Sequence, residues 1–430
     1  MPGLPSGGTP DEPCPVPGAP MSALSRRQSA TLTLILGGLQ AFGPLSIDMY
    51  LPGLPTIARD LGVSDGAAQF TLSAFLIGMA LGQASYGPAT DKYGRKKPLL
   101  FGVALYVLAS VICARSPSIE VLILGRFLQA LGASAGAVIT TAIVRDLYSG
   151  REAADRFSLL MLVMGVAPIL APLLGGLILS RFDWHALFWM LAGLGVLCWL
   201  SVTGLTEPSR AAERAQARLR DAAGTYLALL RQAPFMTYAL GGAFASSAMF
   251  AYISGSSFVF IGALHVSPGV YSLLFGLNAL GLIAASQVNR ALIRRFPLAR
   301  ITGVANSFTL LFALGLGLVT LTGHAAVLTL APLLLGLLIT LGFTFPNTTT
   351  LALDNVRTRL GSAAALRGTL QFVISGLAGS AVGVLSNGAF PERPGLAMAV
   401  VIVACALLST LFLALARRVA PPELGAVPAD

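Results

Sequence analysis

Long apolar runs, most of them about 20 residues in length, alternate with short polar segments along the whole 430-residue chain. A helix needs about 20 mostly apolar residues to cross the hydrocarbon core of a bilayer. Each run therefore predicts a membrane-spanning helix, and the chain is expected to be an all-α membrane protein with twelve transmembrane helices. The predicted spans are 31–53, 68–88, 98–114, 120–147, 157–180, 184–204, 236–262, 269–289, 300–321, 327–352, 362–386 and 394–416.

One polar connection, Glu207 to Gln232, is much longer than the others and divides the spans into two sets of six. The halves echo each other weakly, since DKYGRKKP follows the second span and NRALIRRFP follows the eighth. Two pseudo-symmetric six-helix bundles of this kind hold a substrate between them. We predict a disordered cytoplasmic tail at 1–28, an N-terminal bundle at 29–205, a cytoplasmic central loop at 206–234, a C-terminal bundle at 235–417 and a second cytoplasmic tail at 418–430.

The composition excludes an ordinary soluble domain. Hydrophobic residues make up 55% of the chain and charged residues only 11%, whereas soluble domains carry about a quarter charged residues. With the N-terminus in the cytoplasm, 23 of the 28 Lys and Arg residues lie at inner segments or helix ends, four lie outside, and Arg126 lies within a span. This bias predicts both termini in the cytoplasm and explains the net charge of +10 without a nucleic-acid partner.

No catalytic or metal-binding pattern is found in the sequence. The four cysteines and three histidines have no metal-ligand spacing. GASAGA, in the fourth span, follows no strand and lacks the Lys-Ser/Thr of a nucleotide-binding loop. We therefore expect a protein that is not an enzyme and uses no metal, cofactor or ATP.

Asp48 and Arg126 are the charged residues predicted to lie well inside spans. A charge inside a bilayer costs at least about 2.5–3.5 kcal/mol, so such residues are functional by default. Both are predicted at similar depth, about 8–9 Å below the outer boundary, where they could share a cavity, directly paired or through water. Burial disfavours a charged carboxylate and a nearby arginine favours it, so Asp48 could load and release a proton. The alternatives are that Asp48 caps a broken helix end and that Arg126 only bonds neighbouring helices.

A second candidate is the loop GPATDKYGRKKP, Gly87 to Pro98. Gly87 and Gly94 permit close backbone approach and a tight turn. Asp91 can cap a helix or pair with Arg95, and Asp146 ends the fourth span on the same side. The spacing predicts a cytoplasmic conformational latch; the alternative is a solvated basic loop.

A third candidate is GVAPILAPLLGG in the fifth span. Pro168 and Pro172 remove backbone donors and bend a helix. Gly165, Gly175 and Gly176 allow helices to approach closely. The segment predicts a hinge or a tight seal between helices.

These segments together resemble the major facilitator superfamily. GPATDKYGRKKP resembles its shared loop signature, and RFLQALGASAGAVITTAIVRD resembles the fourth-helix motif of its proton-coupled members. GVAPILAPLLGG is similar to the fifth-helix motif of its drug/proton antiporters, and SIDMYLPGLP is similar to the first helix of the bicyclomycin-resistance (Bcr/CflA) subfamily.

The resemblance implies the major facilitator fold, rocker-switch alternating access and export of drug-like molecules in exchange for protons, in a bacterial inner membrane and by a monomer. It implies that Asp48 binds protons and that Arg126 and Gln129 support coupling, with Asp91, Arg95 and Asp146 in the latch. The alternatives are an exporter of a natural metabolite, such as an amino acid or sugar derivative, and a non-transporting sensor on the same fold.

An apolar, aromatic pocket with a few polar groups would suit drug-sized ligands. For each residue of this set, packing is the competing explanation. The candidate substrate-binding residues are Tyr50, Tyr252, Ser256, Phe258, Asn278, Asn347 and Gln371.

Overall fold

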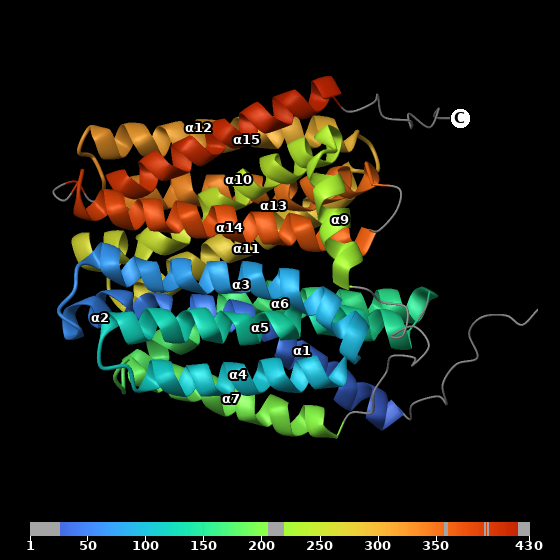
Figure 1. The fold of residues 1–430 in the computed structure, drawn as a ribbon. Coiled ribbons are helices and arrows are strands. Elements are labelled where there is room, and N and C mark those ends of the chain that lie inside the picture. The colour runs from blue at the N-terminus through green and yellow to red at the C-terminus, as the bar shows by residue number, and fades with distance from the viewer. Residues whose placement is uncertain are drawn as a thin grey trace, which may run out of the picture.

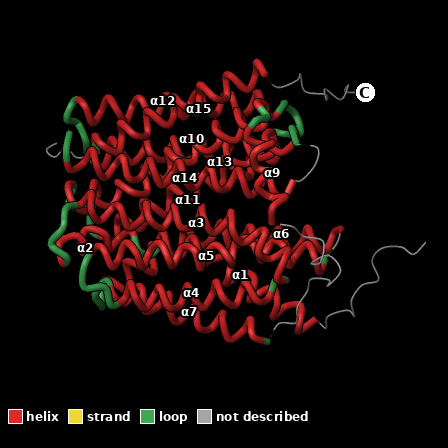
Figure 2. Tube along the Cα trace, in the orientation of Figure 1, coloured by secondary structure: helices red, strands yellow, loops and turns green. Residues whose placement is uncertain are grey.

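The computed structural model describes residues 26–148, 150–204, 219–356, 360–390, 393 and 395–419. Most of both predicted tails, residue 205 and residues 206–218 of the predicted central loop lie outside these ranges. The described residues are almost all helical and form no strand (Figure 2).

The helices fall into two groups that Figure 1 shows one above the other. The lower group contains α1 (Arg26–Asp48), the 3-10 turn η1 (Leu51–Gly53), α2 (Leu54–Asp60), α3 (Asp65–Tyr93), α4 (Lys96–Ala114), α5 (Ile119–Leu147), α6 (Gly150–Leu179) and α7 (His185–Thr203). The upper group contains α10 (Ala233–Ser257), the π-helical turn η2 (Phe258–Ala263), α11 (Pro268–Leu292), α12 (Leu298–Leu321), α13 (Val327–Asp354), α14 (Leu360–Asn387) and α15 (Leu396–Val419).

Twelve helices in the described ranges are long and apolar enough to cross a membrane, which confirms the twelve predicted spans. Most boundaries agree within a few residues, because hydropathy and helix caps mark the ends locally. Ser64 caps α3 by accepting the N–H of Ala67, and Ser267, followed by Pro268, caps α11 in the same way.

The first span differs most from its prediction. It continues to Asp60 rather than ending at residue 53, and it is interrupted after Asp48. Pro52 and Pro55 follow that break, and a proline cannot donate the backbone hydrogen bond that would continue the helix. The prolines therefore form part of the span instead of ending it, and Asp48 lies farther in sequence from the end of the span than expected.

The two bundles meet along two pairs of helices, α3 with α14 and α6 with α11. We call the end where α1 begins and α15 ends the inner end, and the opposite end the outer end. Near the outer end, a Cβ built on Gly66 would lie 2.2 Å from the Gly383 carbonyl oxygen, so glycine allows these backbones to touch. Asn387 accepts the N–H of Gly66 at 3.2 Å and donates to the Ser64 hydroxyl at 2.9 Å. These contacts join the bundles at their outer ends.

The predicted central loop contains a helix, α9 (Leu219–Leu230), at the inner end (Figure 1). Leu229 is buried with Phe235, Leu351 and Leu366 of the upper bundle, and Tyr226 packs against this cluster. The prediction of a polar loop throughout this segment is wrong at its end, where apolar residues recur at helical spacing.

Candidate functional site

Asp48 is the last residue of α1, and its side chain is only 5% exposed. It forms no hydrogen bond or ion pair with another described residue. It lies within electrostatic range of the hydroxyl groups of Tyr252 and Tyr271, which belong to α10 and α11 of the other bundle. The turn η1, immediately after Asp48, also contacts α10 and α11. The carboxyl group therefore lies where the two bundles meet.

The two tyrosines belong to a small aromatic and polar cluster of the upper bundle. Phe275 packs between their rings, with centroids 5.7 Å from Tyr252 and 6.1 Å from Tyr271. Asn278 donates to the Tyr252 hydroxyl at 2.9 Å, and the Ser256 and Tyr271 hydroxyls are 2.8 Å apart. Three of the candidate substrate-binding residues, Tyr252, Ser256 and Asn278, thus lie in one cluster that adjoins Asp48.

Arg126, on α5, is completely buried in the lower bundle. Its guanidinium carbon lies 4.6 Å from the centre of the Tyr50 ring and 4.4 Å from that of Phe75, with the Phe188 ring at 5.8 Å. These distances are those of cation–π contacts, which are strongest when water is excluded. The Nη1 group donates to Gln129 Oε1 at 2.7 Å, whereas Nε and Nη2 have no hydrogen-bond partner among the described residues.

A polar network links Arg126 to α4. Gln129 donates to Ser110 at 2.8 Å, and Ser110 in turn donates to the backbone carbonyl of Tyr106 at 2.7 Å. The Tyr106 hydroxyl lies 2.8 Å from the hydroxyl of Ser46 on α1. Gln129 is therefore placed to orient the Arg126 guanidinium.

The structure does not pair Asp48 with Arg126. Ser46 and Tyr50, four positions apart on the first span, both face the lower bundle, since Tyr50 covers Arg126 and bonds the Thr71 hydroxyl. Asp48 lies between them in sequence, and residues two apart on a helix point to opposite sides. Its side chain is thus directed away from Arg126 and toward the upper bundle. Of the two arrangements considered from the sequence, the direct pair is absent for this geometric reason.

The remaining candidate substrate-binding residues have other surroundings. Tyr50 belongs to the Arg126 cage. Asn347 exchanges two hydrogen bonds with Asn289, at 2.8 and 3.1 Å, inside the upper bundle. Phe258 lines a hollow of about 280 Å³ at the outer end, beside Asp65. Gln371 is half-buried on α14 and forms no recorded bond with the aromatic cluster.

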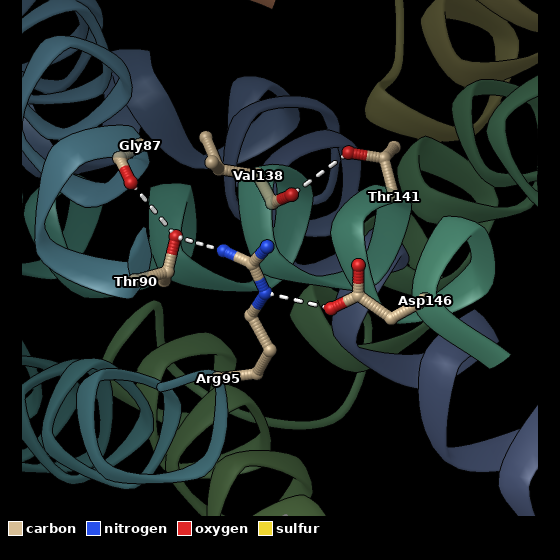
Figure 3. A network of polar contacts seen from close by, with 6 residues as sticks. All are labelled: Gly87, Thr90, Arg95, Val138, Thr141 and Asp146. Carbon is tan, nitrogen blue, oxygen red and sulfur yellow. Dashed lines mark hydrogen bonds and ion pairs between the residues drawn. The ribbon is translucent and has the colours of Figure 1, made fainter. Parts of the chain in front are cut away.

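The latch segment forms a network between α3, α4 and α5 (Figure 3). Arg95 donates through Nε to Asp146 at 2.8 Å and through Nη1 to Thr90 at 2.9 Å. Thr90 donates to the carbonyl of Gly87 at 2.8 Å, an interaction that the sequence analysis did not anticipate.

The two glycines of the latch differ. Gly94 ends α3 with φ 84° and ψ 178°, a conformation that only glycine adopts readily. A Cβ on Gly87 would meet no atom of the described residues within 4 Å, so the structure shows no close approach at this position. The side chain of Asp91 lies outside the described residues.

The predicted hinge segment lies in α6, on the boundary between the bundles. The carbonyl of Pro172 accepts a hydrogen bond from Ser272 of α11 at 2.9 Å. A Cβ on Gly175 would lie 2.1 Å from the Met49 carbonyl oxygen, and one on Gly176 would lie 3.0 Å from Ser272 Oγ. Gly165 faces Ile283 of α11. Pro168 lies one turn before Pro172, and α6 remains a single helix through both.

Two further residues of interest, Tyr271 and Arg367, could not be identified from the sequence. Tyr271 was passed over because it lies in the first turn of α11, where aromatic residues are common at a membrane boundary. Arg367 lies about two turns inside α14 rather than at a helix end, and its Nε atom is buried without a hydrogen-bond partner in the part of the chain that the structure describes. The neighbouring Gly368 abuts Gln83 of α3, so Arg367 is close to the boundary between the bundles.

Comparisons with known proteins agree with this architecture. Residues 36–380 match the sequence profile of the Major Facilitator Superfamily. An uncharacterized MFS-type transporter, YdgK, from Bacillus subtilis (strain 168) is 38% identical over 376 residues, which cover 85% of this chain and 91% of YdgK. A bicyclomycin resistance protein homolog from Haemophilus influenzae is 30% identical over 353 residues, covering 81% of this chain and 88% of that protein. The multidrug resistance protein MdtL from Escherichia coli (strain K12 / DH10B) is 34% identical over 237 residues, 55% of this chain and 60% of MdtL.

Solved structures show the same fold at low sequence identity. A D-xylose–proton symporter matches with a TM-score of 0.72 and 15% identity, over 90% of this chain and 97% of the symporter. A bacterial homolog of the human lysosomal transporter Spinster, in an inward-facing and occupied conformation, matches with a TM-score of 0.70 and 17% identity, over 92% of this chain and 98% of the homolog.

Proposed function

Because the chain belongs to the Major Facilitator Superfamily, we propose that it is a drug/proton antiporter of the bicyclomycin-resistance (Bcr/CflA) type that exports drug-like small molecules from a bacterial cell. The relatives named for bicyclomycin and multidrug resistance support this proposal. Its fold and its relatives are those of transporters rather than enzymes.

The observation that carries the proposal is the position of Asp48. It is a buried carboxyl group at a break in the first span, without a basic partner among the described residues, and the turn that follows it contacts α10 and α11 of the opposite bundle. Low polarity favours its protonated form, and entry of water or ligand between the bundles favours the ionised form. Movement of one bundle against the other changes those surroundings and therefore couples proton binding to conformation.

The cycle proposed has three steps. A drug enters the cavity between the bundles from the cytoplasm and displaces the proton from Asp48. The bundles rock, and the drug leaves on the outer side. A proton then returns to Asp48 from outside, so the proton gradient supplies the energy without a bound cofactor.

The aromatic cluster of Tyr252, Phe275 and Tyr271 is the proposed contact surface for the drug, since flat apolar rings with a few polar groups suit varied drug-sized ligands. The basic residues at the inner end support a cytoplasmic location for both termini. The protein is proposed to lie in a bacterial inner membrane and to work there as a monomer.

Everted membrane vesicles test the function directly. Vesicles containing the chain should accumulate drugs from a panel when a proton gradient is imposed, and collapse of the gradient should abolish accumulation. Asp48→Asn should lose gradient-driven uptake, whereas Asp60→Asn, which changes an exposed carboxylate at the end of α2, should retain it. Equal uptake by Asp48→Asn and the unaltered chain, at equal membrane levels, would remove Asp48 from the mechanism. If the vesicles transported only an amino acid or a sugar derivative from the panel, the exported substrate would be a natural metabolite rather than a drug.

A further inference from the structure

The C-terminal bundle carries a large excess of positive charge. From Ala233 to Val419 the sequence contains ten arginines, and its acidic residues are Asp354 and Glu392. Most of these arginines lie at the inner end, so the charge cannot be balanced within this part of the chain. An anionic group that approaches this end would therefore meet an excess of positive charge.

Two of the arginines, Arg300 and Arg417, line a hollow of about 520 Å³ at the inner end, between the first turns of α12 and the last turn of α15. Both side chains are exposed. Among the described residues, neither guanidinium lies within ion-pair distance of a carboxylate. The hollow thus presents two positive groups in a recess that has room for a further group.

Gly303 provides the room for Arg417. A Cβ built on Gly303 would lie 1.6 Å from Arg417 Nη2, so the guanidinium lies directly over the glycine backbone. A side chain at residue 303 would force the guanidinium to move away from the glycine backbone. The position of Arg417 therefore depends on this glycine.

An apolar surface continues from the hollow toward the middle of the membrane. Val304, Phe308 and Leu311 are all half or more exposed on one face of α12, at the spacing of a helical stripe. Leu411 of α15 is exposed to a similar extent. If a lipid phosphate occupied the hollow, its acyl chains would lie against this adjoining apolar surface. A soluble phosphate would make no use of that surface.

We propose that the hollow between α12 and α15 binds one anionic phospholipid, with Arg300 and Arg417 on its phosphate and its acyl chains along the exposed apolar faces of the two helices. Arginine suits this role because its planar guanidinium donates two parallel hydrogen bonds to a phosphate. Basic recesses between transmembrane helices on the cytoplasmic side are of the kind that holds anionic headgroups. The proposal does not depend on the identity of the exported molecule or on proton coupling.

Lipid binding to the purified full chain can be measured by native mass spectrometry. Phosphatidylglycerol and phosphatidylcholine with identical acyl chains are the probes. Arg417→Gln should weaken the binding of phosphatidylglycerol about five-fold, the value expected from about 1 kcal/mol per basic residue near a lipid surface. Arg418→Gln is the matched control, because it removes the same charge from the next residue, which does not line the hollow. It should leave the affinity unchanged.

A second variant keeps the charge and changes only the shape. Gly303→Ala should weaken phosphatidylglycerol binding in the same direction, because it displaces the Arg417 guanidinium. Equal losses in Arg417→Gln and Arg418→Gln would show a diffuse charge effect and overturn the proposal. Equal affinity for phosphatidylcholine, or displacement of the lipid by millimolar inorganic phosphate, would also overturn it, the latter in favour of a soluble anion.

Discussion

The contact between the outer ends of the two bundles depends on Asn387, near the end of α14. Its side chain accepts the N–H of Gly66 and donates to the hydroxyl of Ser64, both at the start of α3. Asn387→Ala removes both hydrogen bonds and leaves the close backbone approach of Gly66 to Gly383 in place. The substitution should therefore favour conformations in which the outer ends separate, without unfolding either bundle.

The expected magnitude follows from the number of bonds. A hydrogen bond contributes about 0.5–1.5 kcal/mol net, and the lower part of that range applies because Asn387 is exposed. Two bonds together give about 1–2 kcal/mol, which changes the ratio of closed to open molecules by a factor of about 5–30.

Pulsed electron spin resonance can measure this shift. Spin labels at Asp60→Cys and Ala389→Cys, both exposed at the outer end, report the distance between the bundles once the native cysteines are replaced. Asn387→Ala should raise the population of molecules with longer distances between the labels. Ser386→Ala should not, because the Ser386 side chain forms no hydrogen bond between the bundles among the described residues. Identical distance distributions in the two variants would show that the outer contact is not maintained by these hydrogen bonds.

Three further predictions concern the latch, Arg126 and the close contact of α6 with the α1–η1 connection. Gly94→Ala should lower the free energy of unfolding by about 1–3 kcal/mol, because its backbone conformation is restricted to glycine, whereas Gly87→Ala should be neutral in the same thermal melts. Gln129→Leu leaves a buried guanidinium without its acceptor and should cost at least about 1–3 kcal/mol in the same melts; an unchanged melting temperature would show that the bond is not needed. Gly175→Ala should reduce drug uptake by vesicles at normal membrane levels, since the added carbon meets the α1–η1 connection, and Gly193→Ala, with open space around it, should not. Equal uptake by these two variants would contradict the interpretation that α6 forms a tight seal between helices.

Several features of the site follow directly from sequence. The latch could be predicted because Arg95 and Asp146 lie at helix ends, and the span boundaries place those ends on the same side of the membrane. Gly94 could also be predicted, because the latch motif indicates a tight turn at this residue and the turn requires a glycine. Thr90 was missed because a threonine near a helix end carries no distinctive pattern.

The surroundings of Asp48 did not follow from sequence. The expectation that it would share a cavity with Arg126 used depth alone, and depth does not specify the direction in which a side chain points. The first span breaks after Asp48 and continues to Asp60, so counting from a predicted end misplaced it. Tyr271 and Phe275 come from a helix more than 200 residues away, and no local pattern connects them with Asp48.

The sequence by itself determined the number of spans and the class of protein, because transfer of apolar segments into lipid depends on length and composition alone. It also contained the motifs that mark the latch and the predicted tight seal in α6. The tertiary structure decided which side chains meet. It directed Asp48 toward the aromatic cluster, enclosed Arg126 among three rings and joined the outer ends through Asn387. The reason is that contacts between helices depend on rotation about the helix axis and on close packing. Both are set by all neighbouring helices together, rather than by any one segment.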